Sequence, residues 1–133
     1  TNITEALRYL LNVIKKRSIV FVLSDFQSSE FEDALKISAK KHDTIAMQIY
    51  DQREESVPDV GLVRASDPES GEERWIDTSS RKVRDEYQKW WNDKQTELKN
   101  IFNRSNVDLV KLRTDESYIA PLMNFFKRRG SRK

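Results

Sequence analysis

An uninterrupted apolar run is the feature that most constrains the fold of this chain. The segment Ser18-Ile-Val-Phe-Val-Leu-Ser24 has no polar residue between its two serines. A strand with one face in water would instead alternate apolar and polar side chains. The run is strand-sized and falls well short of the roughly 18 residues that a membrane span needs. It therefore predicts a central strand of a parallel sheet, covered on both faces.

Helical and strand patterns alternate on either side of this run. Apolar residues spaced three and four apart predict helices at the N-terminus, around residues 31–39, from about 80 to 102 and around 119–126. Asn2 lies three residues before Glu5, the spacing of a capping box at the first helix. Further strands are expected at 44–50 and 107–112, and Gln48 suggests that the first of these lies nearer an edge.

A turn-rich segment interrupts the alternation after Pro58. Residues 61–66 and 73–77 flank Asp67-Pro-Glu-Ser-Gly71, whose composition is typical of a hairpin loop. We therefore expect one α/β domain over 1–133, a partial doubly wound, mostly parallel sheet flanked by helices. Its parts are helix-strand-helix-strand at 1–60, a β-hairpin insert at 61–78, and helix-strand-helix with a basic tail at 79–133.

Composition excludes several classes of protein. The 133 residues include no cysteine, which rules out disulfides, thiolate metal sites and a cysteine nucleophile and fits a reducing compartment. The 3 glycines have no nucleotide-loop spacing. Lysine and arginine number 24 against 22 acidic residues, which argues against a protein built mainly to capture nucleic acid.

The N-terminus and the hydropathy bear on location. The chain opens with Thr1 rather than methionine, has no signal-peptide pattern and has no apolar run long enough for a membrane span. We expect a cytoplasmic segment of a longer protein, with no membrane attachment within it.

Asp25 is the strongest candidate for a functional residue because of its position in the sequence. It directly follows the apolar strand, and ligands of open α/β sheets bind beyond the carboxyl ends of the strands. A carboxylate there can bind Mg²⁺, act as an acid or base, or simply cap the next helix. Thr1 would begin at the same edge and could add a hydroxyl ligand, although a frayed terminal residue is the simpler interpretation.

Other conspicuous residues favour structural roles. His42, the single histidine, is expected on the surface at the amino edge of the sheet. Trp90 and Trp91 have the helical spacing of core residues, although tryptophans beside lysines can also stack on bases. The basic tail from Lys127 is interpreted as solvated. Nucleic-acid binding through tail and tryptophans stays an alternative that predicts a steep salt dependence.

Several short motifs together resemble one bacterial family. They are Thr1-Asn-Ile3, Ser24-Asp-Phe26, Tyr50-Asp-Gln-Arg-Glu54 with Pro58 and Gly61, Trp75-Ile-Asp-Thr78, Val107-Asp-Leu109 and the segment from Tyr118 to Arg129. In order and spacing, over nearly the whole chain, they resemble the second half of uncharacterised von Willebrand factor A-like proteins that accompany MoxR-type AAA+ ATPases.

The resemblance implies a Rossmann-like sheet with a metal-ion-dependent adhesion site at its carboxyl edge. In that family pattern, an Asp-x-Ser-x-Ser loop, a threonine from a second loop and an aspartate from a third hold the metal. Thr1 matches the threonine and Asp25 the aspartate, but this chain has no Asp-x-Ser-x-Ser. The resemblance therefore implies an incomplete site, with Mg²⁺ expected in the full-length parent and not in this segment.

The function expected from these features is a non-enzymatic protein-interaction domain with a MoxR-type ATPase or its client as partner. The alternative is a Mg²⁺-dependent hydrolase or phosphotransfer domain centred on Asp25. It would need a second carboxylate and a lysine beside Asp25, and Glu30 and Asp33 are the nearest acidic residues along the chain. Three main strands also leave a sheet edge open and apolar helix faces partly uncovered, which predicts a homo-oligomer formed through that edge or through those faces.

Overall fold

The computed structural model describes residues 2–27, 30–66 and 70–131. Helices and strands alternate through most of it, as the sequence predicts. In chain order they are α1 (Ile3–Val13), β1 (Ile19–Ser24), α2 (Glu32–Lys41), β2 (Asp43–Tyr50), α3 (Gln52–Glu55), β3 (Leu62–Ser66), β4 (Glu73–Asp77), α4 (Arg81–Ser105), β5 (Asp108–Arg113) and α5 (Ile119–Gly130).

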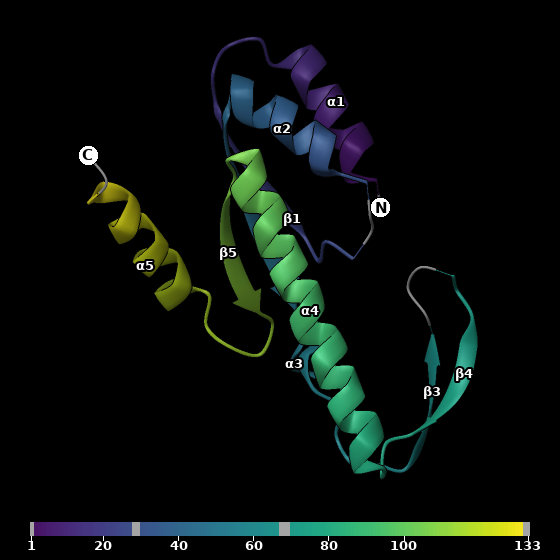
Figure 1. Cartoon of the computed structure of the whole chain (residues 1–133). Coiled ribbons are helices and arrows are strands. Elements are labelled where there is room, and N and C mark those ends of the chain that lie inside the picture. The colour runs from purple at the N-terminus through teal and green to yellow at the C-terminus, as the bar shows by residue number, and fades with distance from the viewer. Residues whose placement is uncertain (1, 28–29, 67–69, 132–133) are drawn as a thin grey trace.

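The main sheet has three parallel strands in the order β1-β2-β5. Helices α1, α2 and α4 cover one face, where Leu7, Leu35 and Phe102 share a core with Ala46 of β2. Helix α5 covers the other face, where Phe125 packs on Ile45 and on β5. Figure 1 shows α4 lying across the sheet, with α1 and α2 above it and α5 to one side. The protein is therefore an α/β structure with helices on both faces of a parallel sheet.

The expected positions of the first two strands are wrong. β1 is an edge strand and β2 is central, because β2 pairs with β1 on one side and β5 on the other. Gln48 is 1% exposed within the central strand, so its polarity does not mark an edge. On β1, Phe21 is 43% exposed, because α5 covers this face over β2 and β5 only.

The hairpin is confirmed as a separate antiparallel pair, β3 with β4. At its base the Thr78 hydroxyl donates to the Gly61 carbonyl at 2.5 Å and accepts from the Val60 N–H at 3.0 Å. Gly61 has a φ of 82°, a conformation that glycine adopts without strain. In Figure 1 the hairpin starts beside the N-terminal end of α4 and stands apart from the main sheet.

The predicted cap by Asn2 is confirmed, and local contacts stabilise two other helix ends. The Asn2 side chain caps α1 by accepting from the Glu5 N–H at 3.0 Å, and Ser80 caps α4 through the Val83 N–H at 3.4 Å. Pro121 lies in the first turn of α5, where its missing N–H has no helical acceptor to lose.

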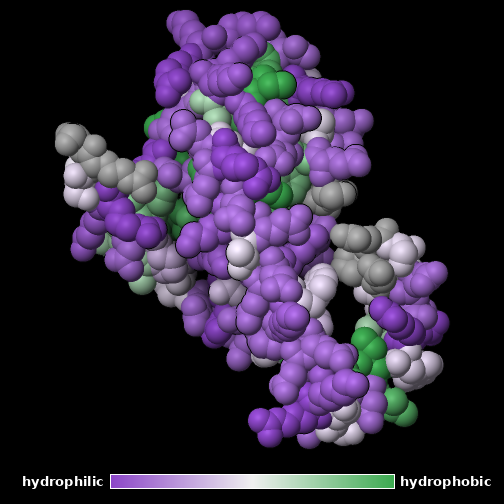
Figure 2. All heavy atoms as spheres, viewed as in Figure 1, coloured by the Kyte–Doolittle hydropathy of each residue, from purple (hydrophilic) through white to green (hydrophobic). Residues whose placement is uncertain are grey.

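The visible surface is mostly hydrophilic, as Figure 2 shows. No helix within the described ranges is long and apolar enough to cross a membrane.

Candidate functional site

A pocket lies where the three parallel strands end. Because the strands are parallel, the residues that follow them meet at one edge of the sheet. Asp25 follows β1, Asp51 follows β2 and Thr114 follows β5. Together with Tyr50 and Glu54 they line an open pocket of about 390 Å³. We call this the carboxyl-edge pocket.

A buried phenylalanine holds Asp25 in position. Phe26 has a φ of 54°, unusual for a residue other than glycine, and its side chain is 1% exposed. Its ring packs edge-on against Phe102 with centroids 5.1 Å apart, so the core fixes the turn that follows Asp25. The turn is closed locally, because Asp25 Oδ1 accepts from the Gln27 N–H at 3.2 Å.

The short helix α3 brings the second and third carboxylates to the pocket. Asp51 caps it through Oδ1, which accepts from the Arg53 N–H at 2.8 Å. Glu54 Oε2 accepts from Gln27 Nε2 at 3.2 Å, which joins α3 to the loop after β1. The Tyr87 hydroxyl of α4 donates to the Glu54 backbone carbonyl. These contacts tie α3 to two neighbouring elements.

The third loop joins the same group. The Thr114 hydroxyl lies 3.4 Å from Asp51 Oδ2, and the Thr114 N–H donates to the Tyr50 carbonyl at 2.9 Å. All three strand ends therefore contribute polar groups to one pocket.

The charge of this pocket is uncompensated. Burial, followed by the negative charge of Asp25, raises the pKa of Glu54 above its ordinary value. Within the described residues, Asp25, Asp51 and Glu54 form no ion pair, and no cationic side chain lines the pocket. Arg113 is nearby, but its guanidinium pairs with other carboxylates, those of Glu55, Asp115 and Glu116.

The three carboxylates of this pocket also accept hydrogen bonds within the protein. Asp25 and Asp51 each use one oxygen on a backbone N–H, and Glu54 uses one on Gln27. No group of three potential metal-ligating His, Cys, Asp or Glu side chains occurs among the described residues. Thr1, the other predicted ligand, lies outside the described residues.

Sequence reasoning identified Asp25 but missed Asp51, Glu54 and Thr114. The rule that selected Asp25, a polar residue directly after a strand, would also have selected Asp51, but Thr114 lies two residues beyond the predicted strand at 107–112 and directly follows β5 only because that strand includes Arg113. Glu54 reaches the pocket only because of α3, a helix of 4 residues that is too short to show apolar periodicity.

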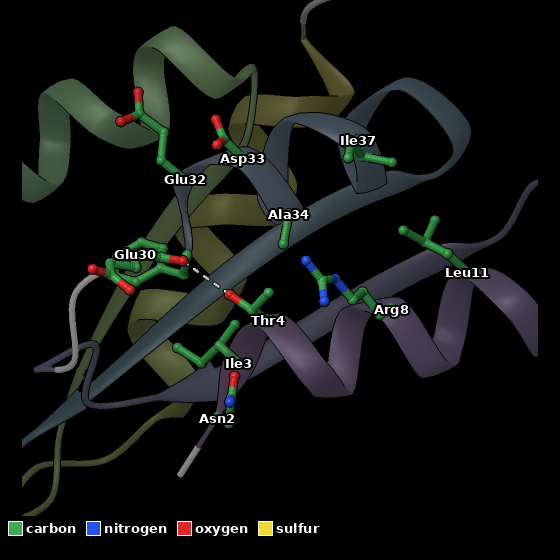
Figure 3. A pocket seen from close by; sticks show the side chains of 11 residues that line it. Asn2, Ile3, Thr4, Arg8, Leu11, Glu30, Glu32, Asp33, Ala34 and Ile37 are labelled. Carbon is green, nitrogen blue, oxygen red and sulfur yellow. Dashed lines mark hydrogen bonds between the residues drawn. The ribbon is translucent and has the colours of Figure 1, made fainter.

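Glu30 and Asp33 do not join Asp25. They line a different cavity of about 810 Å³ between α1 and α2, where the Thr4 hydroxyl donates to the Glu30 carbonyl at 2.9 Å. Figure 3 shows Thr4 and Arg8 rising from α1 toward the residues of α2. The two acidic residues nearest to Asp25 along the chain therefore belong to another surface.

The histidine and one tryptophan also differ from expectation. His42 is at the amino edge, as predicted, but it is buried, with Nδ1 accepting from the Ser18 N–H at 3.0 Å. Trp91 is buried as predicted and packs near Tyr50 with ring centroids 5.9 Å apart. Trp90, its neighbour, is 48% exposed, because adjacent helical residues point about 100° apart.

The fold and the pocket place this protein in a broad class, that of α/β domains with a parallel sheet and an acidic pocket at its carboxyl edge. More specifically, the chain belongs to the family described as protein of unknown function DUF58, whose family model matches residues 1–97.

The relatives that it matches include mycobacterial proteins named as uncharacterised. The chain is 28% identical over 120 residues to protein MAV169 of Mycobacterium avium, covering 88% of the chain and 70% of the relative. It is 27% identical over 120 residues to protein Rv1480 of Mycobacterium tuberculosis, again over 88% of the chain. The chain spans only 38% of the length of that relative. No solved structure matches the chain significantly.

Proposed function

We propose that this segment is a non-enzymatic protein-interaction domain of a cytoplasmic, von Willebrand factor A-like protein that works with a MoxR-type ATPase. The parallel sheet with helices on both faces supports this proposal, as does an aspartate placed directly after a strand at the carboxyl edge. The partner is suggested by the resemblance of the sequence motifs.

The observation that carries the proposal is the uncompensated charge of the carboxyl-edge pocket. Glu54 has a raised pKa because it is partly buried and lies near Asp25 and Asp51. A cation from outside the domain would relieve this repulsion, and the basic side chain of a protein partner supplies one. The lining of the pocket has neither a lysine nor a histidine, and besides its carboxylates it has the hydroxyl groups of Ser24, Tyr50 and Thr114.

Binding to a purified MoxR-type ATPase from the same organism, measured by calorimetry, tests the proposal. Replacing Asp25 with asparagine keeps the acceptor for the Gln27 N–H and removes the charge. We expect Asp25→Asn to weaken binding about tenfold, and Asp85→Asn, on the exposed face of α4, to leave it unchanged. Absence of binding by the unaltered protein would contradict the proposed partnership.

The metal part of the proposal concerns a longer form of the protein, of the kind suggested by the greater length of the relative Rv1480. There Asp25, with Thr1, would be one of several ligands, and the remaining ligands would come from segments outside this chain. A longer form that includes the preceding residues should bind Mg²⁺ or Mn²⁺ in calorimetry and lose that binding on Asp25→Ala. Equal binding by the two forms, or no binding by either, would contradict a role for Asp25 in holding metal.

The alternative is a Mg²⁺-dependent hydrolase or phosphotransfer domain. One observation favours it: Glu54 lies near Asp25 and has a raised pKa, as a second catalytic carboxylate often does. The lysine that this chemistry needs is missing from the lining of the pocket. Turnover of a generic phosphate ester that is lost on Asp25→Asn would support the alternative over an interaction domain.

A further inference from the structure

The second open edge of the sheet, on β5, has backbone groups available for pairing. β5 pairs with β2 on one side only. The Thr114 N–H points toward β2, where it donates to Tyr50, and the N–H groups of alternate residues in a strand point the same way. The backbone N–H and C=O groups of Leu109 and Lys111 therefore point outward, away from the sheet.

This edge forms the floor of a groove. Helix α4 lies on one side of it and α5 on the other, and Figure 1 shows β5 between the two helices. The groove has a volume of about 1220 Å³. Phe102 and Leu109 contribute apolar surface on the α4 side, and Pro121 and Phe125 do so on the α5 side. An extended chain can thus lie along β5 with side chains directed toward both helices.

Four cations surround this groove without compensation. Lys99 comes from α4, Lys111 from β5, and Lys127 and Arg128 from α5. Among the residues that the structure describes, none of the four forms an ion pair with a carboxylate. The positive charge of the groove is therefore available to a ligand.

The acidic residues of the groove are already engaged. Asp108 accepts from Arg129 Nε at 2.9 Å, and Glu116 pairs with Arg113 at 2.8 Å. Neither of these arginines lines the groove. Partial desolvation lowers the pKa of Lys111 below its ordinary value, and the positive charge of Lys99 adds to this effect. The negative charge of Glu55 acts in the opposite direction. A negative group placed beside Lys111 would favour its charged form.

We propose that this groove binds an extended acidic segment of a partner protein, which adds to the sheet as a strand beside β5. The outward backbone groups provide the pairing, and the four cations select for acidic side chains. A nucleic acid could satisfy the cations but could not pair with the strand edge. The groove is separate from the carboxyl-edge pocket, so failure of either proposal leaves the other standing.

The probe is a fluorescent, end-blocked short peptide of alternating glutamate and valine, titrated with the unaltered protein at low ionic strength and followed by anisotropy. Three ligands are compared with it: the same peptide with lysine for glutamate, the same peptide with a methyl group on every backbone nitrogen, and a single-stranded oligonucleotide of equal charge. The methylated peptide keeps its charge but cannot donate backbone hydrogen bonds, so it separates strand addition from simple attraction.

The acidic peptide should bind, and the lysine peptide should not. Methylation should weaken binding about tenfold or more. The double variant Lys99→Glu, Lys127→Glu should weaken it by a similar factor. The control is the double variant Lys82→Glu, Lys89→Glu, which makes the same charge change at exposed positions of α4. Lys82 lies about 25 Å along the helix from Lys99. This control should have little effect on binding of the acidic peptide.

Three results would overturn the proposal: no binding of the acidic peptide, equal binding of its methylated form, or tighter binding of the oligonucleotide. Circular dichroism checks that the variants fold. The methylation comparison uses the unaltered protein and stays decisive even if a variant does not fold.

Discussion

Arg129 of α5 donates two hydrogen bonds to the carboxylate of Asp43 at the start of β2, at 2.7 and 2.5 Å. Its third nitrogen, Nε, donates to Asp108 at the start of β5. One guanidinium thus joins the last helix to the beginnings of two neighbouring strands. It complements the apolar contact that Phe125 makes on the same face of the sheet.

This arrangement predicts an acid-dependent loss of stability that needs Arg129. Hydrogen bonding to Arg129 lowers the pKa of Asp43 below its ordinary 3.8. The stabilisation is fully present above that ordinary value and is lost as the pH falls through the lowered pKa. Arg129→Met should lower the free energy of unfolding by about 1–2 kcal/mol at neutral pH. It should also make the fall in stability at acidic pH, here called the acid limb, less steep. Urea unfolding at several pH values measures both effects. An unchanged acid limb in the variant would contradict the assignment to Arg129.

The two adjacent tryptophans provide a matched test of packing. Trp91 is 8% exposed and Trp90 is 48% exposed. Trp91→Ala should destabilise the protein by about 3–5 kcal/mol, because it removes a buried aromatic side chain and leaves a cavity. Trp90→Ala should cost about 1 kcal/mol, since it loses mainly the contact with Tyr87. Equal unfolding midpoints for the two variants would contradict the orientation of α4.

Asp25→Asn should lower the pKa of Glu54. After burial, the charge of Asp25 is the largest cause that raises this pKa above its ordinary 4.5. A raised pKa means that the charged form of Glu54 is less favourable in the folded state than in the unfolded state. Removing the charge of Asp25 should therefore increase the free energy of unfolding by a few tenths of a kcal/mol at pH values above that pKa. Carboxyl carbon shifts in an NMR titration give the midpoint. Asp85→Asn serves as the control, and a Glu54 midpoint that does not move on Asp25→Asn would contradict the coupling.

Local sequence signals predicted local structure well, and the relative order of strands poorly. Asn2, three residues before Glu5, acts within a single turn of α1, so its effect is visible in neighbouring residues. The position of a strand in a sheet depends on residues far along the chain. The apolar run of β1 looked central because uniform hydrophobicity normally reflects cover on both faces, yet its second face is covered by no described helix.

The candidate site shows the same division. Asp25 was predictable because it directly follows a strand. Its proximity to Glu54 depends on the parallel order of β1 and β2 and on α3, which turns the chain back over the edge. Spacing in the sequence contains neither piece of information.

His42 should protect the Ser18 amide. Its side chain is 1% exposed, and Nδ1 accepts from the Ser18 N–H, which requires the neutral ring with its proton on Nε2. His42→Leu leaves this N–H unpaired and should cost about 1–3 kcal/mol. His42→Asn retains an acceptor. Amide exchange of Ser18 should therefore accelerate more in the leucine variant than in the asparagine variant, and the reverse order would contradict the role of this hydrogen bond.

The open edge of β1 predicts self-association. Ile19, Phe21 and Leu23 point to the same face of this strand and are 62%, 43% and 58% exposed. An unpaired edge with apolar side chains is a template for pairing with another chain, and no described cation lies in the pocket beside this strand. We expect sedimentation velocity to show dimers or larger species that grow with concentration.

Lysine at Ile19 and Leu23 should suppress this association, because charge on an edge strand opposes pairing. Lysine at exposed Tyr9 of α1, a large side chain on a helix rather than on the strand edge, should not. A monodisperse monomer at high concentration for the unaltered protein would contradict the prediction. Association that persists in the double lysine variant would instead assign it to another surface, such as the hairpin with its exposed Leu62 and Trp75.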